Sequence, residues 1–147
     1  MMPAVGLKTF RILLIDDNDA DVYLLRRALQ KAGLAIELTV LKDGAEGLAF
    51  ARGQGEPRGQ GESAPPPDLV VLDLNLPKSG GAEVLRAMKG NPALALVPVV
   101  VMSSSASRAE QAVIAELGAA RFLTKPPDLE GFMKIGEIFR EVLLHGI

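Results

Sequence analysis

Short apolar runs alternate with amphipathic stretches along this chain, and this alternation limits the possible folds more than any other feature of the sequence. The runs, rich in Val, Ile and Leu, predict strands over residues 11–15, 36–41, 68–74, 97–102 and 121–124. Helical spacing predicts helices from Asp21 to Gly33, over 44–52, 81–89 and 107–117, and after Asp128. This pattern is typical of an α/β fold, a doubly wound parallel sheet with helices on both faces.

The length of 147 residues fits one domain. We expect a single domain over 1–147, with its core within about 10–144. Residues 52–67 stand apart, because a tandem hexapeptide, Arg52-Gly-Gln-Gly-Glu-Pro57 and Arg58-Gly-Gln-Gly-Glu-Ser63, leads into a run of prolines. This segment is too polar and glycine-rich to pack, so it predicts a mobile insertion. A tolerated surface loop is favoured there over a partner-binding loop, since long loops cost little stability.

Composition excludes several kinds of site. The chain has no cysteine and a single histidine, His145, which excludes disulfides, thiolate zinc sites and multi-histidine metal sites. A net charge of −2 without a basic patch argues against nucleic-acid binding. The apolar run over 94–102 contains Pro98 and is too short to cross a membrane, and we expect no signal peptide at the start. We expect a soluble cytoplasmic protein without nucleic-acid or membrane partners.

Polar residues follow four of the predicted strands at the point where each strand ends. Asp16 and Asp17 follow the first strand, Asp73 the third, Ser103 the fourth and Lys125 the fifth. Each alone could be an ordinary loop or capping residue, but the carboxyl ends of parallel strands meet at one edge, where such sheets bind ligands. Clustered carboxylates favour a hard cation such as Mg²⁺ or Mn²⁺, and a lysine balances added phosphoryl charge. The pattern therefore predicts a phosphoryl-transfer site with an aspartate acceptor.

These residues belong to four motifs: Ile-Leu-Leu-Ile-Asp-Asp-Asn over 12–18, Leu-Asp-Leu-Asn-Leu-Pro over 72–77, Val-Val-Val-Met-Ser over 99–103 and Phe-Leu-Thr-Lys-Pro over 122–126. In their order and spacing, the chain resembles the receiver domain of bacterial two-component response regulators, from about Phe10 to Leu144. The resemblance implies a flavodoxin-like sheet with strand order 2-1-3-4-5. It also implies a phosphorelay protein rather than an enzyme, with only self-phosphorylation and self-dephosphorylation expected.

The same resemblance implies roles for the acidic residues. Asp73 would accept a phosphoryl group from a phosphohistidine of a sensor histidine kinase. Asp16 and Asp17 would organise Mg²⁺, with Mn²⁺ possible. The direct ligands would be Asp17, Asp73 and the backbone carbonyl of Asn75.

Three further positions match the switch of the family. Lys125 matches its characteristic lysine, Ser103 its switch hydroxyl and Phe122 its switch aromatic. After phosphorylation the Ser103 hydroxyl would bind a phosphoryl oxygen, and Phe122 would turn into the space left behind. The surface formed by the fourth helix, fifth strand and fifth helix would change with it.

A narrower resemblance covers residues 73–78, 83–85, 91–92 and 125–132, which are similar to single-domain regulators paired with phytochrome-type histidine kinases. We expect a stand-alone regulator, with no output module after the matched region. Such relatives often dimerise through the fourth helix, fifth strand and fifth helix. Leu129, Met133, Leu143 and Leu144 leave apolar area on the last helix, so we expect a homodimer, the alternative being that they only close the core.

The sequence departs from the family pattern at Gly80-Gly81, where Asp-Gly is more frequent, so Ser79 is expected to cap the third helix. Phe122 lacks the hydroxyl found in many relatives. The family also favours a cis Lys-Pro bond, here Lys125–Pro126.

Two other functions stay open at this point. A phosphorylation-independent pseudo-receiver would bind partners through the same fold. A haloacid-dehalogenase-type phosphatase also uses an aspartyl nucleophile, but its Asp-x-Asp motif on the first strand is not matched by the adjacent Asp16 and Asp17.

Overall fold

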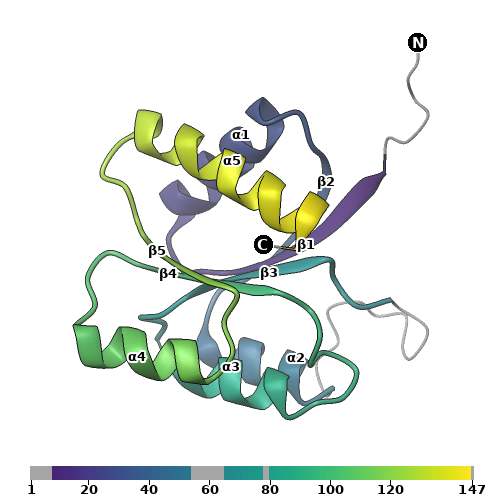
Figure 1. Ribbon diagram of the computed structural model, residues 1–147, viewed down its shortest axis with the longest axis vertical. Coiled ribbons are helices and arrows are strands. Elements are labelled where there is room, and N and C mark those ends of the chain that lie inside the picture. Colours follow the sequence, from purple (N-terminus) through teal and green to yellow (C-terminus); the bar gives the residue numbers. More distant parts are fainter. Residues whose placement is uncertain (1–7, 54–64, 78–79, 147) are drawn as a thin grey trace.

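The computed structural model describes residues 8–53, 65–77 and 80–146. A parallel five-stranded sheet in the order β2-β1-β3-β4-β5 forms its centre, which confirms the predicted fold class and strand order. The strands are β1 (Thr9–Ile15), β2 (Ala35–Leu41), β3 (Leu69–Asp73), β4 (Val99–Ser103) and β5 (Arg121–Thr124). The helices are α1 (Asp19–Lys31), α2 (Gly44–Ala51), α3 (Gly81–Lys89), α4 (Arg108–Glu116) and α5 (Leu129–His145). As Figure 1 shows, α1 and α5 cover one face of the sheet, and α2, α3 and α4 cover the other.

The central strands are apolar along their whole length because helices cover both of their faces. Every residue of β3 and β4 is buried, whereas the edge strand β2 alternates between half-buried and exposed residues up to Leu41. Successive side chains on a strand point to opposite faces. Val70 and Leu72 therefore join the core under α2, α3 and α4, and Leu69 and Val71 join the core under α1 and α5.

Side-chain caps fix where most of the helices begin. Asn18, Asp43 and Asp128 each accept a hydrogen bond from a backbone N–H in the first turn of α1, α2 and α5. Ser107 and Glu110 form the predicted capping box at α4. α3 begins instead after Gly80, which has no side chain to cap it, so the expectation of Ser79 as the cap is wrong; Ser79 itself lies outside the described residues.

The structure corrects some sequence-based boundaries. α1 begins two residues before Asp21, because its cap is Asn18. β4 begins after Pro98, since proline has no N–H to donate to the ladder and Val97 donates instead to Leu94 O at 3.0 Å. No cis peptide bond occurs among the described residues, so the cis Lys125–Pro126 bond expected from the resemblance is wrong. The trans form is the intrinsically favoured isomer of such a bond.

The predicted insertion over 52–67 falls mostly outside the described residues. Arg52 is the C-terminal cap of α2, and the chain is described again from Pro65, three residues before Asp68. Asp68 accepts hydrogen bonds from the Arg11 N–H at 2.8 Å and from Lys8. Among the described residues, no helix is long and apolar enough to cross a membrane.

Candidate functional site

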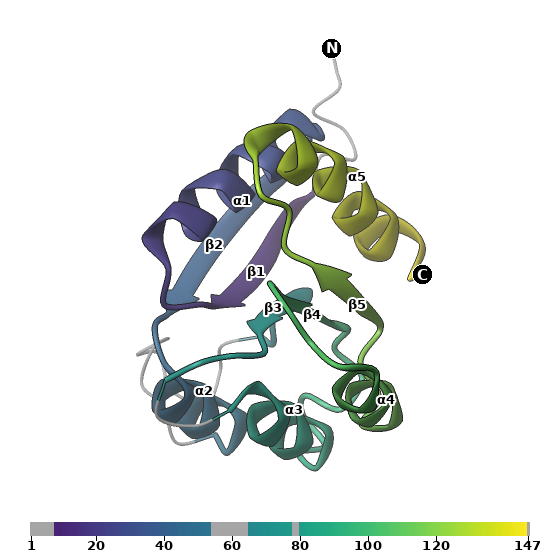
Figure 2. The same cartoon turned by 90° about the vertical axis from the view of Figure 1, so that its left-hand side faces the viewer.

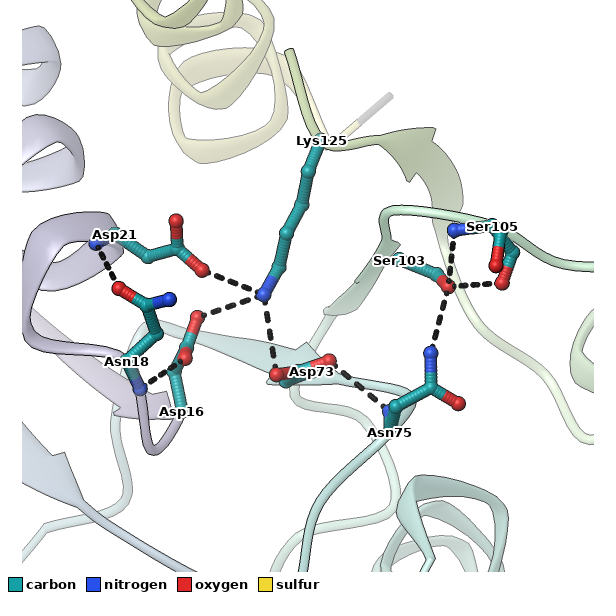
Figure 3. Close-up of polar contacts among 8 residues, drawn as sticks. All are labelled: Asp16, Asn18, Asp21, Asp73, Asn75, Ser103, Ser105 and Lys125. Atoms are coloured by element: carbon teal, nitrogen blue, oxygen red, sulfur yellow. Dashed lines mark hydrogen bonds and ion pairs between the residues drawn. The ribbon is translucent and has the colours of Figure 1, made fainter. Parts of the chain in front are cut away.

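Four predicted polar residues, Asp16, Asp73, Ser103 and Lys125, meet at the edge of the sheet where the strands end (Figure 3). Asp16 follows β1, Asp73 ends β3, Ser103 ends β4 and Lys125 follows β5. Asp16, Asp73 and Ser103 are the buried polar residues of the described chain, with exposures of 4%, 5% and 1%. Burying polar groups is costly unless they are well partnered, so their concentration at one edge marks a built site.

Three carboxylates of this site lie close enough to share a metal ion. One oxygen each of Asp16, Asp17 and Asp73 can be chosen so that all three lie within 4.8 Å of one another. Asp17 is exposed and the other two are buried. An all-oxygen donor set with one solvent-facing carboxylate suits a hard divalent cation that keeps part of its water shell. The predicted metal-binding carboxylates thus come together, and the Asn75 carbonyl as a further ligand stays a prediction.

Lys125 supplies the positive charge that holds the carboxylates together. Its Nζ lies 3.1 Å from Asp73 Oδ2, 3.4 Å from Asp16 Oδ2 and 2.6 Å from Asp21 Oδ2. Burial lowers the pKa of Lys125, but the hydrogen bond to Asp21 and the charges of Asp16 and Asp73 outweigh it and raise the pKa above its ordinary value. The ammonium is therefore charged throughout the physiological range.

Asp16 is costly to ionise because it is buried. Desolvation by burial raises its pKa to about 6, although a hydrogen bond from the Asn18 N–H (2.8 Å) and the charge of Lys125 act in the opposite direction. A carboxylate that is costly to ionise is one that a bound cation would stabilise, so this environment fits the metal site.

Asp21 was not predicted as a site residue, yet it is the nearest partner of Lys125. It lies in the first turn of α1, and its backbone N–H donates to Asn18 Oδ1 at 3.1 Å. The one usable signal in the sequence is its position three residues after the capping Asn18. A first-turn side chain on the helix that follows β1 can point back over the edge of the sheet.

Ser103 is bonded away from Asp73. Its hydroxyl donates to the Ser105 carbonyl at 2.6 Å, and its Oγ accepts from Asn75 Nδ2 and from the Ser105 N–H, each at 3.1 Å (Figure 3). Asn75 also donates its backbone N–H to Asp73 Oδ1 at 3.0 Å. Asn75 thus links the Asp73 carboxylate to the serine, and the hydroxyl must exchange partners before it can reach a group on Asp73.

Phe122, the predicted switch aromatic, is not part of the polar cluster. It lies on β5 opposite Val101 of β4 and packs, half-buried, against the core under α2, α3 and α4. Its role in switching stays a prediction.

Comparisons with known proteins show which proteins this chain is similar to. The family described as "Response regulator receiver domain" matches residues 12–135. Response regulator Rcp1 of Synechocystis sp. is 40% identical over 124 residues, which are 84% of this chain and 82% of Rcp1. The solved structure of the phosphorylated cyanobacterial phytochrome response regulator RcpA has a TM-score of 0.82 and 34% identity, covering 95% of this chain and 97% of RcpA. The Mn²⁺-bound form of Rcp1 has a TM-score of 0.80 and 36% identity, covering 94% and 96% of the two chains.

Proposed function

Because this chain belongs to the response regulator receiver family, we propose that Asp73 accepts a phosphoryl group from a phosphohistidine of a sensor histidine kinase. The observation that carries this proposal is the position of Asp73. Its carboxylate is buried at the end of β3 and fixed by Lys125 on one oxygen and the Asn75 N–H on the other.

The transfer is a displacement at phosphorus. One carboxylate oxygen of Asp73 forms a bond to phosphorus, the P–N bond of the phosphohistidine breaks, and the imidazole leaves with the bonding electrons and takes up a proton. Lys125 neutralises charge on the transferred oxygens, and the buried setting strengthens that interaction. Asp16, Asp17 and Asp73 would hold Mg²⁺, which supplies two further positive charges beside the phosphoryl group. The solved Mn²⁺-bound form of Rcp1 supports a divalent metal here, Mn²⁺ included.

Phosphorylation would be transmitted through Ser103 and Phe122. The phosphoryl oxygens offer the Ser103 hydroxyl stronger acceptors than the Ser105 carbonyl it now uses. Movement of Ser103 would leave room beside Phe122 on the neighbouring strand and change the surface formed by α4, β5 and α5. The chain is thus a phosphoacceptor in signalling, and the chemistry expected of it is limited to its own phosphorylation and dephosphorylation.

Two proposals concern its partners. The similarity to RcpA, a phytochrome response regulator, supports a bacteriophytochrome as the histidine kinase. Exposed apolar side chains on α4 and α5, namely Val113, Leu129 and Leu144, support a homodimer through the surface of α4, β5 and α5. In Figure 2 these three elements lie along one side of the molecule.

The decisive experiment is phosphorylation by a small donor. Purified protein is incubated with acetyl phosphate and Mg²⁺, and its intact mass is measured. We expect one phosphoryl adduct, lost in Asp73→Asn and after addition of a chelator, and retained in Asp19→Asn, which removes an exposed acid of α1.

Other outcomes contradict the proposal in distinct ways. An adduct that persists in Asp73→Asn would mean another acceptor. The absence of both an adduct and Mg²⁺ binding would favour the pseudo-receiver, and sustained phosphate release from simple monoesters would favour the phosphatase.

A further inference from the structure

Asp21 is one of three carboxylates that contact Lys125, and its contact is the shortest of the three. The distance from Lys125 Nζ to Asp21 Oδ2 is 2.6 Å, against 3.1 Å to Asp73 Oδ2. In Figure 3 the lysine side chain descends to an ammonium that has Asp21 to its left and Asp73 below it. The ammonium is therefore shared between the residue that would be phosphorylated and one that would not.

The Asp21 carboxylate is held in place beside the Lys125 ammonium. The α1 cap holds its backbone, since the Asp21 N–H donates to Asn18, and only 17% of its side chain is exposed. It is not among the carboxylates near enough to one another to share a metal ion, which are Asp16, Asp17 and Asp73. Among the described contacts of the site, the partner of the Asp21 carboxylate is the Lys125 ammonium.

Phosphorylation of Asp73 would change the anionic partners available to the Lys125 ammonium. An ammonium has three N–H donors and no acceptor, and in this structure all its charged partners are carboxylates: Asp16, Asp21 and Asp73. A phosphoryl group on Asp73 brings new charged oxygens that need the same ammonium. If the ammonium moves toward the phosphoryl group, its hydrogen bond and ion pair with Asp21 are weakened or lost.

We propose that Asp21 is a positioning residue that competes with the phosphoryl group for Lys125 and so lowers the affinity of the site for a phosphoryl group. This inference rests on the proposed function of Asp73.

The test measures how tightly each variant binds beryllofluoride, an anion that mimics a phosphoryl group on aspartate, by calorimetry at saturating Mg²⁺. Asp21→Asn keeps the side-chain size and an acceptor oxygen for Lys125 but removes the charge. We expect it to bind beryllofluoride roughly three- to tenfold more tightly, the scale of one weakened charge-assisted hydrogen bond.

Asp19→Asn is the matched control. Asp19 lies two residues earlier in the same helical turn, but 86% of its side chain is exposed and it pairs with Lys42 instead. The control removes the same charge from the same turn without touching Lys125, so its affinity for beryllofluoride should equal that of the parent protein.

Two further measurements separate competition from a merely structural effect. In a Lys125→Met background, Asp21→Asn should change the affinity no more than Asp19→Asn does. With acetyl phosphate as donor, Asp21→Asn should lower the donor concentration needed for half-maximal rate more than it changes the maximal rate. Asp21→Ser, whose shorter side chain also removes the charge, should likewise tighten the binding of beryllofluoride. This second variant keeps the test valid if Asp21→Asn fails to fold.

The outcomes distinguish the inference from the function beneath it. If Asp21→Asn binds beryllofluoride equally or more weakly, or if Asp19→Asn tightens binding as much, the competition does not exist. If Asp21→Asn still tightens beryllofluoride binding in the Lys125→Met background, Asp21 does not act through the lysine. If the parent protein neither binds beryllofluoride nor gains a phosphoryl adduct at Asp73, the proposed function itself is wrong.

Discussion

Asp16 shows how one buried side chain makes the stability of the whole protein depend on pH. Its carboxyl has a folded-state pKa of about 6 against 3.8 for an unperturbed aspartate, chiefly because it is buried. A raised acid pKa means that the folded state binds the proton more tightly than the unfolded state does. The contribution to stability is therefore fully present below about pH 3.8 and is lost as the pH rises through about 6.

We predict that Asp16→Asn stabilises the metal-free protein at pH 8 and does nothing at pH 4. Asparagine keeps an oxygen that can accept from the Asn18 N–H but has no charge to desolvate. The gain in free energy of unfolding should be about 1–3 kcal/mol at pH 8, the scale of a shift of about two pKa units. Urea denaturation in the presence of a chelator, repeated between the two pH values, measures it. An equal effect at both pH values would show that the burial of charge is not its cause.

At the scale of elements, the start of α3 is packed against the end of β3. Gly81 is the first residue of α3, and its N–H donates to the Leu74 carbonyl at 3.0 Å. A Cβ on Gly81 would lie 2.6 Å from the Asp73 carbonyl oxygen and 2.9 Å from Leu74 Cα, both backbone atoms. Only glycine allows this helix to approach so near Asp73, whereas a Cβ on Gly80 would meet nothing within 4 Å.

The paired substitutions Gly81→Ala and Gly80→Ala test this contact. Gly81→Ala should lower the free energy of unfolding by roughly 1–3 kcal/mol, as overpacking of a core does, and should slow phosphorylation of Asp73 by displacing its backbone. Gly80→Ala should leave both quantities nearly unchanged. Thermal melts and the rate of adduct formation with acetyl phosphate provide the readouts. Similar losses in both variants would mean that the loop, rather than the close approach, sets the geometry.

The elements themselves could be predicted from sequence because their signals are local. Apolar runs located the strands, and the cap residues Ser107 and Asp128 located the starts of α4 and α5. The gathering of Asp16, Asp73, Ser103 and Lys125 was predictable because the ends of parallel strands must meet.

Other features of the site depend on geometry that no local signal carries. The contact between Asp21 and Lys125 depends on the rotation of α1 about its axis relative to a loop 104 residues away. The partners of Ser103 depend on the rotamers of Asn75 and on the path of the loop to Ser105. The distance between Gly81 and Asp73 O depends on how closely a helix and a strand pack.

For the molecule as a whole, the proposed dimer can be tested by the mass of the particle that sediments in solution. In the presence of beryllofluoride and Mg²⁺ the protein should sediment as a dimer. Val113→Asp or Leu144→Asp, which place a charge on the surface of α4, β5 and α5, should weaken the dimer by about tenfold or more, as loss of a buried anchor does. Leu96→Asp is the control, since Leu96 is 96% exposed but lies between α3 and β4. A monomer in every case, or equal weakening by all three variants, would contradict this surface as the interface.

The attachment of α4 has a consequence for how the molecule fluctuates. α4 buries a single residue, Ile114, whereas α5 buries Phe132, Ile135, Gly136, Phe139 and Val142. Few buried contacts mean a small free energy for local opening, so the amide hydrogens of α4 should exchange with solvent well before those of α5. A helix held by so few buried contacts would need only a modest change at the edge of the sheet to shift its position. The rest of the domain stays folded around the aspartate while it does so.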